Sequence, residues 1–178
     1  MRFAKSNRGV GLIEVLVALL IIAVGVLGAV ALQSRAVQAG MESYQRAQAL
    51  LLVEDMVERI KNNRAFATGC YVISGYLGSG ATTVPSGCNT MADVDIAGWH
   101  ALLQGASEVQ SDNQKVGGIL GARGCIVSEG VGRFRVSVAW QGLSKLDNGN
   151  ADACASGTFG DEGYRRVVGV SFRLAKLN

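Results

Sequence analysis

The sequence predicts an α+β protein in which one long N-terminal helix packs on a small antiparallel β-sheet. Residues 15–32 contain no charge and no proline. Apolar residues then recur at helical spacing up to about residue 63, and three later segments alternate apolar with polar residues, as strands do. With about a third of the 178 residues in the helix, one compact domain of roughly 110 residues remains.

A short basic segment precedes the apolar run. It contains Arg2, Lys5 and Arg8, and the small residue suited to cleavage before the run is Gly9. A secretory signal peptide is cleaved after its apolar core. Cleavage after Gly9 removes only the basic leader and keeps the apolar helix, so we expect the mature chain to begin at Val10.

Glu14 places a carboxylate at the start of the apolar run. A charge at the centre of a membrane span costs about 2.5 to 3.5 kcal/mol, so an acid kept in a span usually has a partner. After cleavage, the amine of Val10 lies one helical turn before Glu14, and the amine of a neighbouring subunit could reach it too. The alternative interpretation is an uncleaved signal anchor with an incidental acid near its cytoplasmic edge.

The charge distribution predicts both topology and partners. Three of the 17 Lys and Arg residues lie in the leader, so the mature chain has 14 basic against 14 acidic side chains. This balance argues against a patch for nucleic acid or anionic membrane. The first charge after the apolar run is Arg35. The positive-inside tendency therefore places the N-terminus in the cytoplasm and everything after the span outside it.

Four cysteines lie in the part of the chain that follows the helix, namely Cys70, Cys88, Cys125 and Cys154. Their even number, the absence of a C-x-x-C pair and the oxidising compartment favour two disulfides over a metal site. Three connectivities are possible. We favour Cys70 with Cys88 and Cys125 with Cys154.

The long helix is expected to run from about Leu12 to Asn63, roughly 75 to 80 Å at 1.5 Å per residue. On its polar face, Glu42 with Arg46 and Asp55 with Arg59 stand four residues apart and form ion pairs. Its second half presents an apolar stripe to the domain that follows, made of Met41, Tyr44, Ala47, Leu50, Leu51, Val53, Val57 and Ile60.

The domain after Arg64 begins with a glycine-rich segment. We expect a mostly irregular loop from Thr68 to Met91, followed by a helix from its N-cap Asp95 to about Val109. One face of that helix carries Trp99, Leu102, Leu103 and Ala106. His100 lies on its polar side, where we expect it to be solvated.

Three strands are expected at Cys125–Ser128, Arg133–Gln141 and Tyr164–Leu174. Residues 129–132 are suited to a hairpin turn. Arg165 and Arg166, at the start of the third strand, are interpreted as a charged strand edge that discourages pairing with other strands. In the middle strand, the inward side chains are Phe134, Val136, Val138 and Trp140, and the outward ones are Arg133, Arg135 and Ser137.

The sequence contains no arrangement that predicts catalysis. We find no Ser/His/Asp set, activated cysteine, phosphate-cradling loop or paired carboxylates in a credible cleft, and therefore expect no enzyme, no cofactor and no metal. Residues 147–152 offer several oxygen-bearing side chains that could hold calcium. However, Gly149 occupies the third position of an EF-hand order and no bidentate Glu follows, so a solvated turn is favoured.

The N-terminus resembles that of type IV prepilins, in which a glycine, a new N-terminal residue and a glutamate have the spacing of Gly9, Val10 and Glu14. Residues 46–64 (RAQALLLVEDMVERIKNNR) are similar to the helix end of PilV-type minor pilins, and residues 93–99 (DVDIAGW) to their short second helix. The resemblance implies a pilin-like roll, cleavage and N-methylation at Val10 by a prepilin peptidase, and a role for Glu14 in docking the subunit into a helical assembly. Major pilins commonly carry a proline in the span. This chain has Ala29-Val30-Ala31 there, which favours a minor subunit.

This resemblance also implies a domain plan: leader 1–9, transmembrane half-helix 10–33, periplasmic half-helix 34–64 and disulfide-bonded domain 65–178. It places the span in the bacterial inner membrane and the domain in the periplasm, with the protein incorporated at or near the pilus tip. The implied role is pilus assembly or initiation in a priming or tip complex, and so motility or adhesion. The expected partners are other minor pilins, the major pilin, the prepilin peptidase, the inner-membrane assembly platform and membrane lipid. A minor pseudopilin of a type II secretion system and a pilus-tip adhesin module remain alternatives.

Overall fold

The computed structural model describes residues 11–88, 90–106, 111, 117–146 and 151–175. It divides the chain into two compact units, with the boundary between Met41 and Glu42. The four-stranded sheet and the second helix all lie in the second unit. Gly9 and Val10, the expected processing site, lie outside the described residues.

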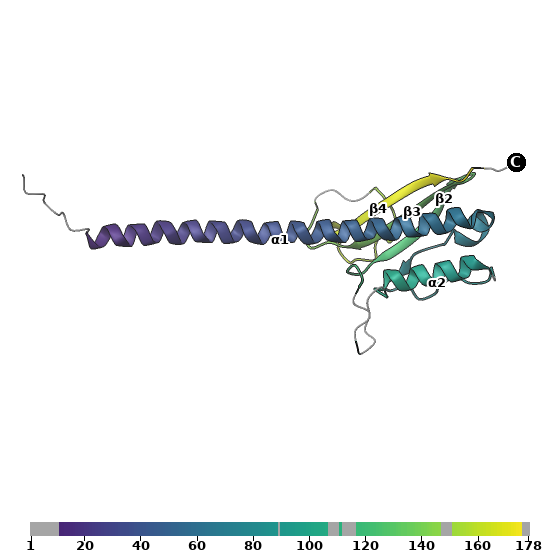
Figure 1. Cartoon of the computed structure of the whole chain (residues 1–178), viewed down its shortest axis with the longest axis horizontal. Helices are drawn as coiled ribbons and strands as arrows, with labels where there is room; N and C mark the ends of the chain where they lie inside the picture. Colours follow the sequence, from purple (N-terminus) through teal and green to yellow (C-terminus); the bar gives the residue numbers. More distant parts are fainter. Residues whose placement is uncertain (1–10, 89, 107–110, 112–116, 147–150, 176–178) are drawn as a thin grey trace, which may run out of the picture. The chain divides into compact units, whose positions relative to one another are not determined.

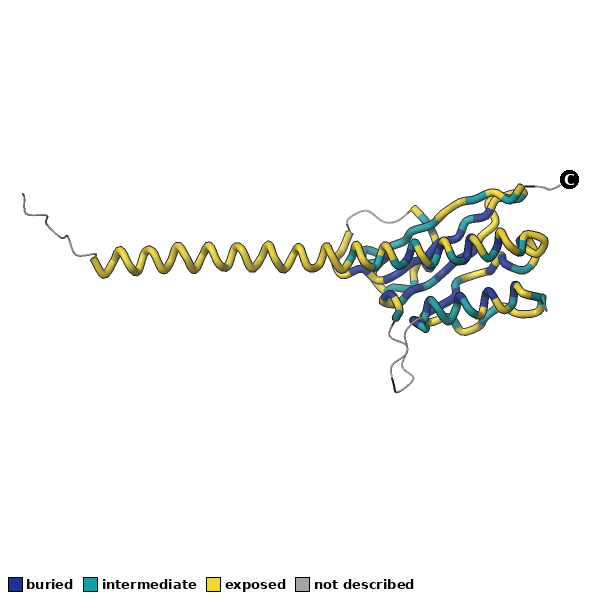
Figure 2. Tube along the Cα trace, viewed as in Figure 1, coloured by how far each residue is buried: buried dark blue, intermediate teal, exposed yellow. Residues whose placement is uncertain are grey.

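Helix α1 covers Leu12–Asn62, within one residue of the predicted end (Figure 1). In the first unit its residues are exposed on all sides (Figure 2). In the second unit it buries Ala49, Val53, Met56, Val57 and Ile60. The predicted stripe was wrong at four positions, which are exposed: Met41, Tyr44, Ala47 and Leu51.

The segment after α1 is mostly irregular, as predicted. It contains a short 3₁₀ turn (Arg64–Phe66), a π turn (Ala67–Tyr71) and the two-residue strand β1 (Leu77–Gly78). The second helix, α2, covers Met91–Leu103, so it begins before the predicted start and ends before the predicted end. Its N-cap is Thr90, whose Oγ1 accepts a hydrogen bond from the Ala92 amide at 3.2 Å.

The remaining strands are β2 (Arg123–Gly130), β3 (Arg133–Gln141) and β4 (Arg165–Arg173), with a 3₁₀ turn at Glu162–Tyr164. They form one antiparallel sheet in the order β1-β2-β3-β4. β3 has the predicted bounds, and β2 extends two residues beyond the prediction at each end. The predicted hairpin joins β2 to β3 through Gly132, whose φ of 68° is readily adopted by glycine.

The core lies between one face of the sheet and the two helices (Figure 1). Phe134, Val136, Val138 and Trp140 are all buried there, as predicted. Trp99 of α2 is fully buried and donates its indole N–H to the Leu52 carbonyl of α1 at 2.8 Å. Its ring packs so closely on β2 that a Cβ atom at Gly124 would overlap it. Thus, Trp99 contacts both layers of the domain.

The opposite face of the sheet carries a smaller buried cluster of Cys125, Ala139, Cys154 and Ala155. Ser137 was predicted to face outward and does lie on this face, yet it is only 2% exposed. Its hydroxyl donates to Asp152 Oδ2 at 2.6 Å. The segment that contains Cys154 therefore covers part of the face that the sequence pattern assigned to solvent.

Candidate assembly site

Glu14 lies in the first turn of α1, where its amide donates to the Gly11 carbonyl at 2.9 Å. The side chain is exposed. The helix dipole favours an acid at this end of a helix. The Val10 amine that the sequence pairs with Glu14 lies outside the described residues, so this contact stays a prediction.

The part of α1 after Glu14 is long and apolar enough to cross a membrane, and it is the one such helix among the described residues. From Leu12 to Leu32 its large apolar side chains are all at least 49% exposed. Isolated exposed apolar side chains are normal on soluble proteins, but a continuous surface of this size indicates a membrane or protein contact. The first unit thus presents one acid followed by an uninterrupted apolar surface.

In the second unit, an ionic cluster joins α1, the π turn and α2. Arg59 donates to Asp55 at 2.8 Å and to Asp95 at 3.2 Å. The Tyr71 hydroxyl donates to the other oxygen of Asp95 and accepts from Asn63 Nδ2 at 3.1 Å. Burial and the hydrogen bond to Asp95 raise the pKa of Tyr71 to about 12. The prediction of Asp95 as an N-cap was therefore wrong, because it lies inside α2 and holds this cluster together.

His100 is also more enclosed than predicted. It is half-buried, and its Nδ1 accepts a hydrogen bond from the Gly78 amide at 3.1 Å, while Nε2 lies 3.0 Å from Gln104 Nε2. The hydrogen bond from Gly78 joins α2 to β1. The histidine therefore has a structural place in the domain.

Two disulfides close the domain, Cys70 with Cys88 and Cys125 with Cys154. This is the favoured pairing. The first closes the loop before α2, and the second ties the long β3–β4 connection to β2. They stabilise the irregular parts of a small domain chiefly by constraining its unfolded chain.

Glu42 does not pair with Arg46 as predicted. Instead, its Oε1 accepts from Arg166 at 3.2 Å and from the Ser144 hydroxyl at 2.9 Å. Burial opposes ionisation, but the Ser144 hydrogen bond and the Arg166 charge lower the pKa of Glu42 below its usual value. The second unit thus fixes its first residue to the start of β4.

The prediction that Arg165 and Arg166 form an exposed charged edge was also wrong. Arg165 is 4% exposed and donates to the backbone carbonyls of Asp152 and Cys154 at 2.7 and 3.1 Å. Arg166 donates to the Ser144 carbonyl at 2.6 Å. Both arginines fasten the long connection to the sheet, and alternation along a strand gives no signal for that function.

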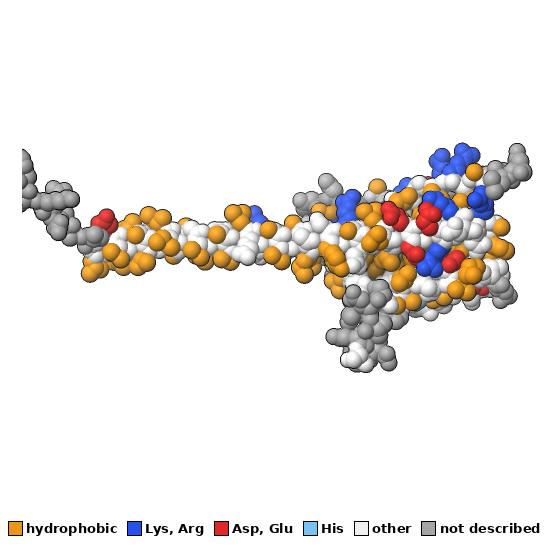
Figure 3. Space-filling view, in the orientation of Figure 1, with side chains coloured by type: hydrophobic (Ala, Val, Ile, Leu, Met, Phe, Trp, Pro, Cys, Tyr) orange, Lys and Arg blue, Asp and Glu red, His pale blue; other side chains and the backbone are white. Residues whose placement is uncertain are grey.

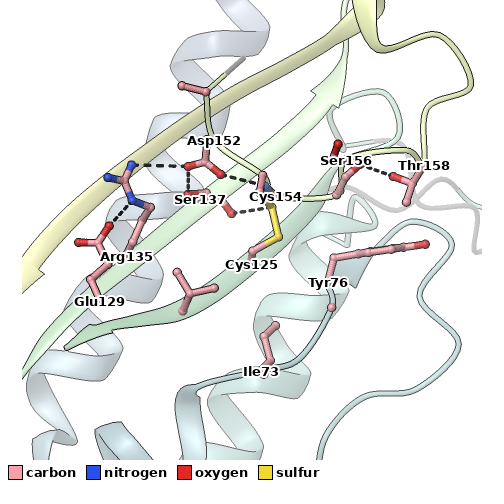
Figure 4. A pocket seen from close by; sticks show the side chains of 15 residues that line it. Ile73, Tyr76, Cys125, Glu129, Arg135, Ser137, Asp152, Cys154, Ser156 and Thr158 are labelled. Atoms are coloured by element: carbon pink, nitrogen blue, oxygen red, sulfur yellow. Dashed lines mark hydrogen bonds and ion pairs between the residues drawn. A yellow bond between two sulfur atoms is a disulfide. The ribbon is translucent and has the colours of Figure 1, made fainter. Parts of the chain in front are cut away.

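A hollow of about 650 Å³ lies beside the second disulfide, between the 73–76 segment and the 151–158 segment (Figure 4). At its polar end, Asp152 accepts from Ser137 and from the Cys154 amide, and Arg135 lies 3.6 Å from Asp152. Four residues of the possible calcium loop, 147–150, lie outside the described residues. Within the described part of the chain, no group of three or more acidic, histidine or cysteine residues is arranged to hold a metal.

The apolar N-terminal helix and the disulfide-bonded α+β domain define a membrane-anchored protein of the pilin type. A family model described as type IV pilin Tt1218 matches residues 31–97, and a model of the prokaryotic N-terminal methylation motif matches residues 4–30. No curated protein and no solved structure matches the chain significantly. Together with the fold, the two family matches identify the chain as a type IV pilin.

Proposed function

We propose that this pilin is a minor, PilV-like subunit that takes part in initiating pilus assembly. The observation that carries the proposal is the order Gly9, Val10 and Glu14 in front of an unbroken apolar helix, within the part of the chain that matches the methylation motif. In a pilin, this order provides a cleavage site, a new amine and a carboxylate that binds an amine. The role is structural, and no catalytic step is needed for it.

In this proposal, a prepilin peptidase removes residues 1–9 and methylates the Val10 amine. Residues 10–33 anchor the subunit in the inner membrane, with its N-terminus in the cytoplasm. Residues 34–64 continue the helix into the periplasm, and residues 65–178 form the domain that meets other pilins. Membrane lipid surrounds the span before assembly. The assembly platform then moves the subunit into a priming or tip complex with other minor pilins and the major pilin.

The Glu14 carboxylate can form an ion pair with the Val10 amine of its own subunit or with the N-terminal amine of a neighbouring subunit. In the apolar interior of a helical bundle, this charge pair is stronger than in water because the local dielectric constant is lower. A subunit with an unpaired Glu14 retains a costly charge in the membrane. Docking against a neighbour's amine therefore favours the assembled state.

Mass spectrometry of the mature membrane form tests the processing step. We expect a chain that begins at a methylated Val10. Active material that retains residues 1–9 would contradict the proposal. The favoured cleavage site also predicts that Gly9→Leu leaves the leader in place, whereas Gly11→Ala, a change two residues further on, is processed normally.

Deletion of the gene tests the assembly role, with piliation, twitching motility and protein secretion measured in the same strain. Loss of pili and twitching with normal secretion supports the minor pilin. Loss of secretion with normal piliation would indicate a type II secretion pseudopilin instead. Normal assembly with lost surface attachment would indicate a tip adhesin.

A further inference from the structure

Two arginines stand directly opposite each other on neighbouring strands of the sheet. Arg133 of β3 is registered with Arg173 of β4, and both side chains are exposed. Neither forms an ion pair with another residue that the structure describes. The adjacent Arg135 differs, because Glu129 accepts from it at 2.5 Å. Like charges directly opposite on a sheet destabilise it, so an anion that binds between Arg133 and Arg173 is stabilising.

These arginines line a surface hollow of about 620 Å³. Its other lining residues are Glu129, Arg135, Ser171 and Phe172. Arg133 and Arg135 alternate with the buried Phe134 and Val136, so the guanidinium groups lie on the face of the sheet that points away from α1. The hollow therefore offers, on the outer side of the domain, two guanidinium groups that form no ion pair among the described residues, although the charge of Arg133 also acts on Glu129.

The same domain carries exposed carboxylates on its other side. Glu54 and Glu58 lie one helical turn apart on α1 and are exposed, whereas Val53 and Val57 beside them are buried against the sheet. Figure 3 shows acidic side chains gathered over this half of α1. Glu58 has Lys61 at 2.7 Å, while Glu54 has no ion pair among the described residues.

We call the exposed face of α1 that carries Glu54 and Glu58 the acidic ridge. Its charge is negative overall. Its main basic side chain, Arg59, is shared between Asp55 and Asp95. One positive charge thus faces two carboxylates, and Glu54 adds a further negative charge. The domain therefore has an acidic ridge on one side and an arginine pair on the other.

We propose that the Arg133–Arg173 pair of one copy binds the Glu54–Glu58 ridge of a second copy of this chain. The Cβ atoms of residues four apart on a helix are separated by about 5 to 6 Å, and those of residues directly opposite on antiparallel strands by about 5 Å. Two ion pairs can therefore form side by side. Arginine also suits this contact because its planar group binds a carboxylate through two hydrogen bonds.

The proposed contact is heterologous, because the two surfaces differ and lie on opposite sides of the domain. Contacts of this kind repeat from copy to copy instead of closing a two-fold dimer. The inference goes beyond the proposed priming role, which does not require two copies to lie side by side. It concerns the exposed domains and does not involve Glu14.

Photo-crosslinking of the full-length chain in membranes tests the contact. A photoreactive residue replaces Ser171, which lines the hollow, and the yield of the crosslinked species that contains two copies is measured. We expect the crosslinked peptide to come from α1 near Glu54. Arg133→Glu/Arg173→Glu and, separately, Glu54→Arg/Glu58→Arg should each lower the yield at least fivefold, because each variant loses both ion pairs and its reversed charges repel the facing surface.

Mixing the two reversed variants provides the sharper test. Each variant repels its own kind, but the reversed sheet of one matches the reversed ridge of the other. Co-expression of differently tagged variants should therefore restore crosslinking between unlike copies only. Restoration also shows that both variants fold. Arg46→Glu, an exposed charge reversal outside both surfaces, should leave the yield unchanged.

Two results would overturn the proposal. One is a crosslink from Ser171 to another protein or to lipid with none to a second copy. The other is loss of crosslinking in the separate variants with no recovery on mixing. Neither result bears on priming, because piliation after deletion of the gene is measured independently.

Discussion

The Tyr71 hydroxyl donates a hydrogen bond to the Asp95 carboxylate, and this contact joins the π turn after α1 to the middle of α2. Tyr71 is fully buried and Asp95 is only 8% exposed. Arg59 provides the positive charge that makes burial of this carboxylate tolerable. Three segments that are distant in sequence are therefore held by one polar cluster at the edge of the apolar core.

Asp95→Ala should destabilise the domain by about 2 kcal/mol, because it leaves the buried Tyr71 hydroxyl without its acceptor. Urea unfolding of the full-length chain in detergent, followed by tryptophan fluorescence, measures this. The matched control is Asp55→Ala, which removes the more exposed carboxylate bound to Arg59 while Asp95 still pairs with that arginine. We expect the control to cost below about 0.5 kcal/mol. An equal fall in the free energy of unfolding in both variants would show that the buried Tyr71–Asp95 hydrogen bond adds nothing beyond an exposed ion pair.

Stability should also fall at alkaline pH through Tyr71. Its pKa rises from the ordinary tyrosine value of 10.0 in the unfolded chain to about 12 in the folded domain. The folded state therefore holds this proton more tightly than the unfolded state does. The resulting stabilisation is complete below pH 10 and is lost as the pH rises through 12. The free energy of unfolding should decline more steeply between these values in the wild type than in Tyr71→Phe, and equal slopes would contradict the assignment.

The long helix, the α+β class, the presence of two disulfides and the bounds of β3 follow from the sequence. Each produces a strong local or compositional signal: an unbroken helical period, strict alternation, or an even set of cysteines. The two-residue strand β1 has no such signal. Leu77 and Gly78 are strand residues only because Gly124 and Arg123 of β2 lie beside them.

The errors concern polar side chains whose partners lie far away in sequence. Helical spacing suggests Arg46 for Glu42, but the structure supplies Arg166, 124 residues away. Similarly, alternation places Ser137 outside, but the Cys154 segment folds over it. In the assembly motif, Glu14 stands out in the sequence as an acid at the start of an apolar run. The structure adds its place in the first turn of α1.

Gly124→Ala should disrupt the contact between α2 and the sheet. The added methyl group would overlap the Trp99 ring and Leu103, both of which are buried. Overpacking of this kind costs about 1 to 3 kcal/mol, and we expect a corresponding fall in the free energy of unfolding. Gly69→Ala is the control, since no atom lies within 4 Å of the position of its added methyl group. A Gly124→Ala domain as stable as that control would show that Trp99 does not pack closely on β2.

Removal of the Cys125–Cys154 disulfide should destabilise the domain by about 3.5 kcal/mol, and removal of Cys70–Cys88 by about 3 kcal/mol, since a longer closed loop constrains the unfolded chain more. The cysteines of each bridge are separated by 29 and 18 residues, respectively. Paired Cys→Ala variants, compared by urea unfolding, provide the measurement. In the wild type, non-reducing peptide mapping should give these two bridges and no free thiol. A Cys70–Cys125 bridge would contradict the pairing.

Glu14→Ala should prevent assembly without affecting folding. Glu14 lies in the first unit, whereas the core residues and both disulfides lie in the second. Removing its charge makes the span more apolar, so membrane insertion should be retained. We therefore expect normal accumulation in the inner membrane, unchanged disulfides, and loss of pilus incorporation or priming.

Leu16→Ala is the matched control for Glu14→Ala, because it shortens an exposed apolar side chain two residues further along the same helix and leaves the carboxylate in place. Sheared pili and the inner-membrane fraction are probed for each variant, and piliation is scored in a deletion strain that carries it. The control should restore piliation, because the apolar surface of the span is otherwise intact. If Glu14→Ala also restores wild-type piliation and is recovered in sheared pili at the control level, Glu14 does not direct docking. The apolar surface of α1 would then have to be sufficient for assembly by itself.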